Sequence, residues 1–141
     1  MRTRLMAMAA ALLVLPAGAA LADHSPDPDF GAGGKVIVGS TRVDWFSDVT
    51  SVADGYLAVG TWADDHIVVM KYDAEGVKDF RFGDNGRLIV DLEASARGVQ
   101  IIERAGGDFL VTAATGFGLA QLVITADGQY AAAARANQIF L

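Results

Sequence analysis

An internal repeat of 52 residues is the feature that most limits how this chain can fold. Shifted by 52 positions, the 141-residue sequence matches itself without a gap, with about 11 identities over the overlap. The matches fall mainly at glycines and apolar positions, including Phe30-Gly31 with Phe82-Gly83 and Gly34 with Gly86. A fixed period of this length is typical of a fold that uses one supersecondary unit more than once. We expect repeat one at about 27–78, repeat two at about 79–130, and a partial tail at 131–141.

Each repeat contains short runs rich in Val, Ile, Leu and aromatic residues, separated by Gly and Asp, which predict strands and tight turns. The runs fall at about 48–52, 56–62, 66–72 and 87–92 in the first repeat, and at about 98–104, 108–113, 119–125 and 129–134 in the second. Four short antiparallel strands every 40 to 50 residues or so are typical of a β-propeller blade. We therefore predict an all-β fold with two β-propeller-like blades, and a small β-sandwich as the alternative.

The number of blades is the difficulty with this prediction. Propellers close with about four to eight blades, and two blades alone leave apolar strand edges exposed. Three arrangements stay open at this point. Copies of the chain could self-associate to complete a propeller, the chain could be a truncated product, or two sheets could form a compact sandwich.

The N-terminus has the three-part pattern of a secretory signal. Arg2 and Arg4 precede the apolar stretch 5–20, and Ala20-Leu21-Ala22 supplies small residues at a cleavage site. We predict a signal peptide at 1–22, a domain at 23–141, and a periplasmic or secreted location. An uncleaved anchor is the alternative.

The charge balance excludes several partners. The chain carries 11 basic and 17 acidic residues, a formal net charge of −6, and removal of Arg2 and Arg4 brings it near −8. An acidic domain repels nucleic acid, and no basic amphipathic stretch indicates membrane binding after signal cleavage. The chain has no cysteine, so neither disulfides nor a lipid-modified cysteine are expected.

The glycine-rich segments resemble a known family. Asp27-Pro28-Asp29-Phe30-Gly31-Ala32-Gly33-Gly34-Lys35-Val36 resembles the "LDxxFGxGGKV" motif of the delta-60 repeat, and Lys78–Leu88 follows the same pattern. The second copy departs at Val123-Ile124-Thr125, where the first has Lys71-Tyr72-Asp73. The resemblance implies a β-propeller-like repeat of bacterial exported proteins and no settled activity.

The same segments could suggest a phosphate-binding loop, but such a loop follows a strand and opens a helix, and neither is expected here. We therefore interpret them as structural turns, with the two phenylalanines packed between blades. The residues of this structural repeat motif are Phe30, Gly31, Gly34, Phe82, Gly83 and Gly86.

Candidate binding residues are aromatic and acidic side chains near expected strand ends, although ordinary blade packing also explains the aromatics. They are Trp45, Phe46, Trp62, Asp64, Asp65 and His66. No G-x-S-x-G pattern occurs, and the acidic turns lack the spacing of a calcium loop. We predict no catalytic residue, metal or cofactor. The expected function is a recognition or surface-structure module with a glycan or protein ligand. An oligomeric propeller enzyme, such as a glycan-cleaving hydrolase or lyase, is the alternative.

Overall fold

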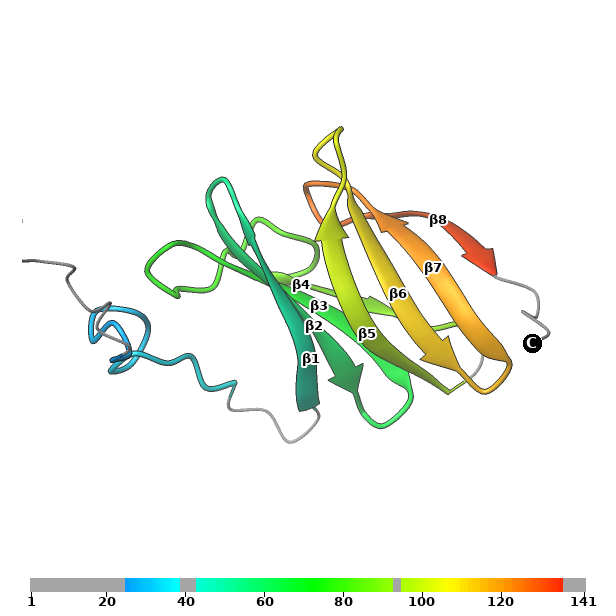
Figure 1. The fold of residues 1–141 in the computed structure, drawn as a ribbon, viewed down its shortest axis with the longest axis horizontal. Coiled ribbons are helices and arrows are strands. Elements are labelled where there is room, and N and C mark those ends of the chain that lie inside the picture. The colour runs from blue at the N-terminus through cyan, green and yellow to red at the C-terminus, as the bar shows by residue number, and fades with distance from the viewer. Residues whose placement is uncertain (1–24, 39–42, 93–94, 136–141) are drawn as a thin grey trace, which may run out of the picture.

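The computed structural model describes residues 25–38, 43–92 and 95–135, which form two four-stranded antiparallel sheets (Figure 1). In both sheets the strands follow one another in chain order. This confirms the all-β class and the repeated four-strand unit, and the described residues form no closed propeller. The predicted signal peptide at 1–22 lies outside the described residues.

The strands agree in number with those predicted, and β1 starts earlier than expected. Sheet 1 contains β1 (Val43–Val52), β2 (Gly55–Trp62), β3 (His66–Tyr72) and β4 (Arg87–Val90). Sheet 2 contains β5 (Ala96–Glu103), β6 (Phe109–Thr115), β7 (Gly118–Ile124) and β8 (Tyr130–Arg135). The first strand of each sheet is irregular at an equivalent place, between Phe46 and Asp48 in β1 and between Gly98 and Gln100 in β5.

The main core lies between the two sheets. Alternate residues of β2 and β3 in sheet 1 pack against alternate residues of β5, β6 and β7 in sheet 2. The buried members include Leu57, Val59, Ile67, Val69, Phe82, Ile101, Phe109, Val111, Leu122 and Ile124. Each such side chain contributes about 1.5–3 kcal/mol when fully buried.

Strand β3 is buried on both faces, which explains its unbroken apolar sequence. Ile67 and Val69 belong to the main core, whereas Val68 and Met70 face the other way. On that outer face they form a second cluster, against which Val36 and other residues pack. Residues 25–38, which we call the N-terminal arm, thus cover part of sheet 1.

The two repeats stack head to tail. Leu122 and Ile124 of β7 face the main core, but their equivalents 52 residues earlier, Met70 and Tyr72, lie on the outer face of sheet 1. The face of sheet 2 that packs against sheet 1 is therefore equivalent to the outer face of sheet 1, which points away from sheet 2. A two-fold sandwich would instead bring equivalent faces together.

Strand β6 departs by one residue from the 52-residue offset. Three residues join β2 to β3, because Trp62 pairs with His66, but two join β6 to β7, because Thr115 pairs with Gly118. The hairpin at Arg104–Asp108 is correspondingly longer than the turn between β1 and β2. Residues of β6 therefore occupy the same positions in the sheet as the residues of β2 that lie 53 places earlier. The ungapped 52-residue alignment is wrong by one residue within this strand.

The fourth strands are not equivalent. Strand β4 follows the Phe82-Gly83 motif, whereas β8 begins directly after the turn that contains Gly128. In repeat one, the corresponding chain makes a single bridge between Tyr72 and Lys78 and then turns away. In repeat two the Ala-rich stretch continues along β7 as a strand.

The two Phe-Gly motifs have the same backbone geometry. Gly31 bridges Lys35 as Gly83 bridges Arg87. The Gly31 N–H donates to the Glu75 carbonyl at 2.7 Å, and the Gly83 N–H donates to the Asp127 carbonyl at 2.8 Å. Phe82 is 1% exposed between the sheets, while Phe30 is partly buried and lies edge-on to Tyr56 at 5.5 Å between ring centroids.

Candidate functional site

One end of the two sheets gathers most of the candidate binding residues. The β2–β3 and β6–β7 turns both lie at the lower end of the sheets in Figure 1. A backbone hydrogen bond joins the two sheets at this end, since the Ala96 N–H donates to the Asp65 carbonyl at 2.9 Å. We call this region the turn end, and it comprises Trp45, Trp62, Asp64, Asp65, His66, Asp91 and Phe117.

At the turn end, His66 lies between two carboxylates. Its Nδ1 contacts Asp65 Oδ1, and its Nε2 is 3.6 Å from Asp91 Oδ2. All three side chains are partly open to solvent, with 31% of the His66 side chain exposed. An imidazole held this way could exchange a proton with a bound molecule. Among the described residues, no group of three or more acidic or histidine side chains is arranged to hold a metal ion.

The two tryptophans each stack with an arginine. The Arg97 guanidinium of sheet 2 lies 5.4 Å from the Trp45 ring, and that of Arg87 lies 4.8 Å from the Trp62 ring. Such cation–π pairs hold an indole in place while leaving part of it exposed. Trp45 is 45% exposed.

The structure separates the predicted aromatic residues. Trp45 pairs with Thr61 and approaches Arg97 of sheet 2, whereas Phe46 lies on the outer face of sheet 1. Asp64, Asp65 and His66 stay together with Trp62 at the turn end. The β2–β3 turn needs a left-handed backbone at Ala63 and Asp64, with φ of 52° and 70°.

Sequence reasoning missed Phe117. This side chain is 82% exposed in the two-residue β6–β7 turn, at the same end as the β2–β3 turn (Figure 1). The signal was available, because a phenylalanine between two glycines in a tight turn has no core to enter.

A groove of about 500 Å³ separates the N-terminal arm from the outer face of sheet 1. Its walls are mainly apolar and aromatic, and Phe46 is the one predicted binding residue among them. Burial raises the pKa of Tyr72 above its ordinary value of 10.0. The lining residues are Asp27, Phe30, Gly34, Val36, Phe46, Val49, Tyr56, Ala58, Tyr72 and Ala74.

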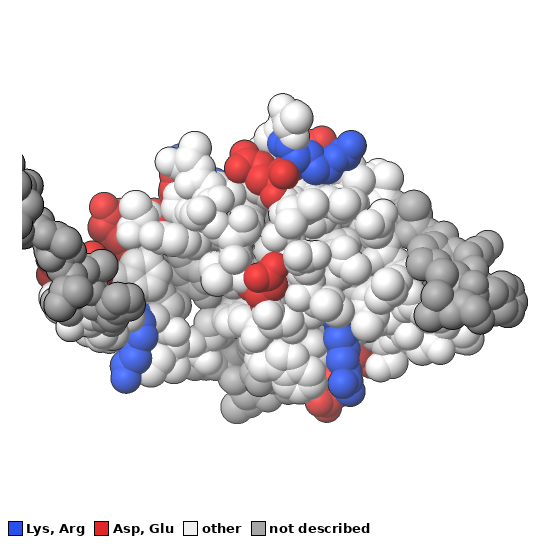
Figure 2. All heavy atoms as spheres, in the orientation of Figure 1, with Lys and Arg blue, Asp and Glu red and all other residues white. Residues whose placement is uncertain are grey.

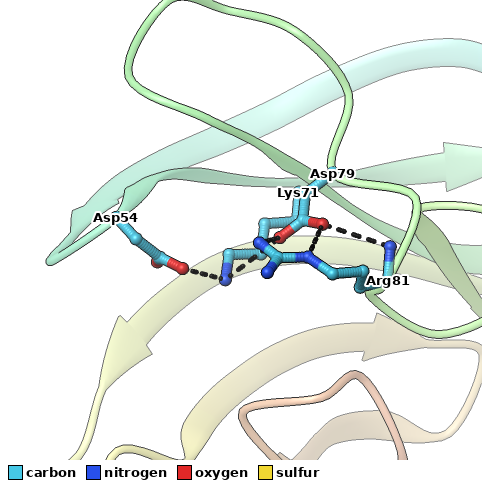
Figure 3. Close-up of polar contacts among 4 residues, drawn as sticks. All are labelled: Asp54, Lys71, Asp79 and Arg81. Carbon is cyan, nitrogen blue, oxygen red and sulfur yellow. Dashed lines mark hydrogen bonds and ion pairs between the residues drawn. The ribbon is translucent and has the colours of Figure 1, made fainter.

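A cluster of four charged side chains lies next to the Phe82 motif (Figure 3). Lys71 Nζ is 2.8 Å from Asp54 Oδ2 and 3.5 Å from Asp79 Oδ2. Arg81 binds both Asp79 oxygens, at 2.9 and 3.0 Å. The hydrogen bonds from Arg81, together with the nearby Lys71 charge, lower the pKa of Asp79 to about 2. Because the charges largely satisfy one another, the cluster fits a structural role at the base of the motif. The four residues come from three separate segments of the chain, so their spacing in the sequence does not predict the cluster.

The fold defines the chain as an all-β repeat protein with two four-stranded antiparallel sheets of similar size. No family model, curated protein or solved structure matches it. Within the part of the chain that the structure describes, no helix is long and apolar enough to cross a membrane.

Proposed function

We propose that the chain is an exported β-propeller-type repeat module that serves in recognition or surface structure. The observation that carries the proposal is the head-to-tail stacking of two four-strand units. Blades of a propeller stack in this way, because rotation about one axis always brings the front of one blade to the back of the next. The N-terminal pattern of residues 1–22 supports export.

The turn end is the favoured recognition surface. It offers two exposed aromatic side chains, Trp45 and Phe117, at the same end of the sheets as the acidic groups around His66. Aromatic faces stack on the apolar faces of sugar rings, and carboxylates accept hydrogen bonds from hydroxyl groups. We therefore propose a neutral glycan as the ligand, with a protein surface of similar chemistry as the second choice.

The experiment is a calorimetric titration of the purified protein with soluble neutral oligosaccharides of bacterial surfaces. We expect Trp45→Ala and Phe117→Ala to weaken binding about tenfold each, as for exposed aromatic contacts worth about 1.4 kcal/mol. Val77→Ala is the matched control, because Val77 is 56% exposed but lies outside the turn end. Unchanged affinity in both aromatic variants would remove the turn end as the recognition surface.

A glycan-cleaving enzyme is the second candidate, favoured by the position of His66 between Asp65 and Asp91. An imidazole flanked by carboxylates can act as a general acid or base. The same oligosaccharides should then be cleaved, and His66→Ala should abolish cleavage while the unfolding midpoint stays within a few degrees. Absence of any cleavage product by the wild-type protein would exclude this candidate for the glycans tested.

A further inference from the structure

No other element among the described residues covers the outer face of sheet 2, and this face is mostly uncharged. Ile102, Leu110 and Val123 are direct cross-strand partners and form an apolar row across β5, β6 and β7. Ile102 is 45% exposed, and Leu119 on the same sheet is 49% exposed. The neighbouring row consists of Gln100, Thr112 and Gln121, which carry no charge.

This face is the repeat equivalent of a face that is already buried inside the molecule. Leu119 corresponds to Ile67 at the 52-residue offset, and Leu110 corresponds to Leu57 at the offset of 53 that holds in β6. Ile67 and Leu57 are both 0% exposed in the core between the sheets. Residues on the outer face of sheet 2 are therefore equivalent to residues that sheet 1 buries against sheet 2.

The groove face of sheet 1 is the complementary half of the same interface. Tyr56 and Ala58 line the groove, and Met70 belongs to the buried cluster on the same face. These three residues correspond to Phe109, Val111 and Leu122, which pack against sheet 1 in the core. The groove also holds Phe30, which rests on Gly76 as Phe82 rests on Gly128. Each of the two faces that meet in the core thus has an equivalent elsewhere in the chain. One equivalent is the outer face of sheet 2 and the other is the outer face of sheet 1, and they lie on opposite sides of the molecule.

We infer that these two faces bind each other in separate copies of the chain: the outer face of sheet 2 in one copy packs into the groove face of sheet 1 in the next. This inference rests on the proposed propeller-type fold and names its partner as a second copy. The contact is heterologous, so repeated copies form a ring if the rotation closes. With two blades per chain, rings of about two to four copies give the four to eight blades of known propellers.

The charge distribution fits this partner. Although the chain carries a net charge of −6, the two faces hold few charged residues, among them Arg97 in register with Leu119 on sheet 2 and Asp27 in the groove. In the view of Figure 2, charged side chains gather mostly at the upper and lower ends of the sheets, and most of the surface between them is uncharged. Two copies can therefore approach face to face without bringing their acidic groups together.

One internal contact indicates the register between copies. Across the core, the Ile101 N–H donates to Asp48 Oδ2 at 3.0 Å. At the 52-residue offset, Asp48 corresponds to Gln100 and Ile101 to Val49. Gln100 of one copy should therefore reach the backbone at Val49 of the next. Ile102, two residues along β5 from Gln100, then lies beside the Val49 side chain.

The test uses the protein purified from expression of the full chain, with light scattering and sedimentation over a range of concentrations. We expect a discrete oligomer of two to four copies. Ile102→Glu and Val49→Lys should each raise the dissociation constant on the order of tenfold or more, because each buries a charge without a partner. A chain carrying both substitutions should regain most of the affinity, because the opposite charges meet at every interface. Val77→Lys is the matched control and should leave assembly unchanged.

A wild-type protein that is a monomer at all concentrations would overturn the inference, as would an oligomer that neither single substitution weakens. An oligomer weakened by Val77→Lys as strongly as by the other two would also overturn it. Glycan titration is independent of this result. Binding by a monomer would retain the recognition function and reject the ring, while assembly without glycan binding would do the opposite.

Discussion

Replacement of Phe82 by alanine should remove much of the stability of this domain. Phe82 is 1% exposed in the core between the sheets, where its ring lies over Gly128. Phe30, at the equivalent place in repeat one, is only partly buried. The pair therefore provides one substitution at two levels of burial.

The size of the effect follows from the burial. A fully buried Phe→Ala substitution costs about 3–5 kcal/mol, because the lost transfer free energy adds to the cost of a cavity. Phe30→Ala should cost about 1–2 kcal/mol, since Phe30 is only partly buried and its removal leaves a smaller cavity. Domains of this size have a total free energy of unfolding of about 5–15 kcal/mol, so Phe82→Ala brings the protein close to unfolding.

The assay is equilibrium unfolding in urea, followed by far-ultraviolet circular dichroism at a dilution where the wild-type protein is monomeric. The slope with urea should be similar for both variants, and the midpoint should fall much further for Phe82→Ala. Equal losses for the two variants, or a loss below about 1 kcal/mol for Phe82→Ala, would refute the assignment of Phe82 as the plug between the sheets.

Three further predictions concern single groups. The Thr61 hydroxyl is buried without a hydrogen-bond partner among the described residues, so Thr61→Val should raise the unfolding free energy by about 1 kcal/mol in urea titrations, and a loss would show an unseen partner. Gly128→Ala should lower the unfolding free energy by about 1–3 kcal/mol more than Gly107→Ala. Both glycines have φ of 82°, but a Cβ at Gly128 would lie 2.5 Å from the Gly83 nitrogen, whereas a Cβ at Gly107 would meet no atom within 4 Å. Equal urea midpoints for the two variants would contradict this. Because the folded-state pKa of Asp79 is about 2, below its ordinary 3.8, its stabilisation of about 1 kcal/mol is present above pH 4 and is lost as the pH falls toward 2. Asp79→Asn should flatten the unfolding free energy over that range, and an unchanged pH profile would refute the role of the cluster.

The sequence was informative about the repeated unit and less so about how its strands pair. Val, Ile and Leu runs bounded by glycine predict strands because local composition decides them, and all eight were found. The offset of β6 was invisible, because one extra residue at Arg104–Asp108 and one fewer before Gly118 cancel in an ungapped match. Register depends on turn geometry, which eleven identities over the overlap cannot resolve.

For the candidate site, too, the sequence predicts local neighbours but not contacts between distant segments. Asp64, Asp65 and His66 stay together because they are adjacent in one turn. Trp45 and Phe46 are also adjacent, but neighbouring residues on a strand point to opposite faces, so they separate. The exposure of Phe117 follows from its place between two glycines in a turn, but its position at the turn end depends on how sheet 2 packs beside sheet 1, which no local pattern in the sequence predicts.

The unequal lengths of the β2–β3 and β6–β7 turns also affect how the strands of two similar repeats avoid mispairing during folding. A chain with near-copies of the same strands risks pairing β2 with β7, or β6 with β3, in a trapped state. Here each correct pair is joined by a turn of its own length, three residues in one repeat and two in the other. Short loops close quickly and set their own register. The one-residue difference in turn length therefore gives the β2–β3 and β6–β7 pairs different registers. This difference favours pairing of each strand with its neighbour in the chain over pairing with the equivalent strand of the other repeat.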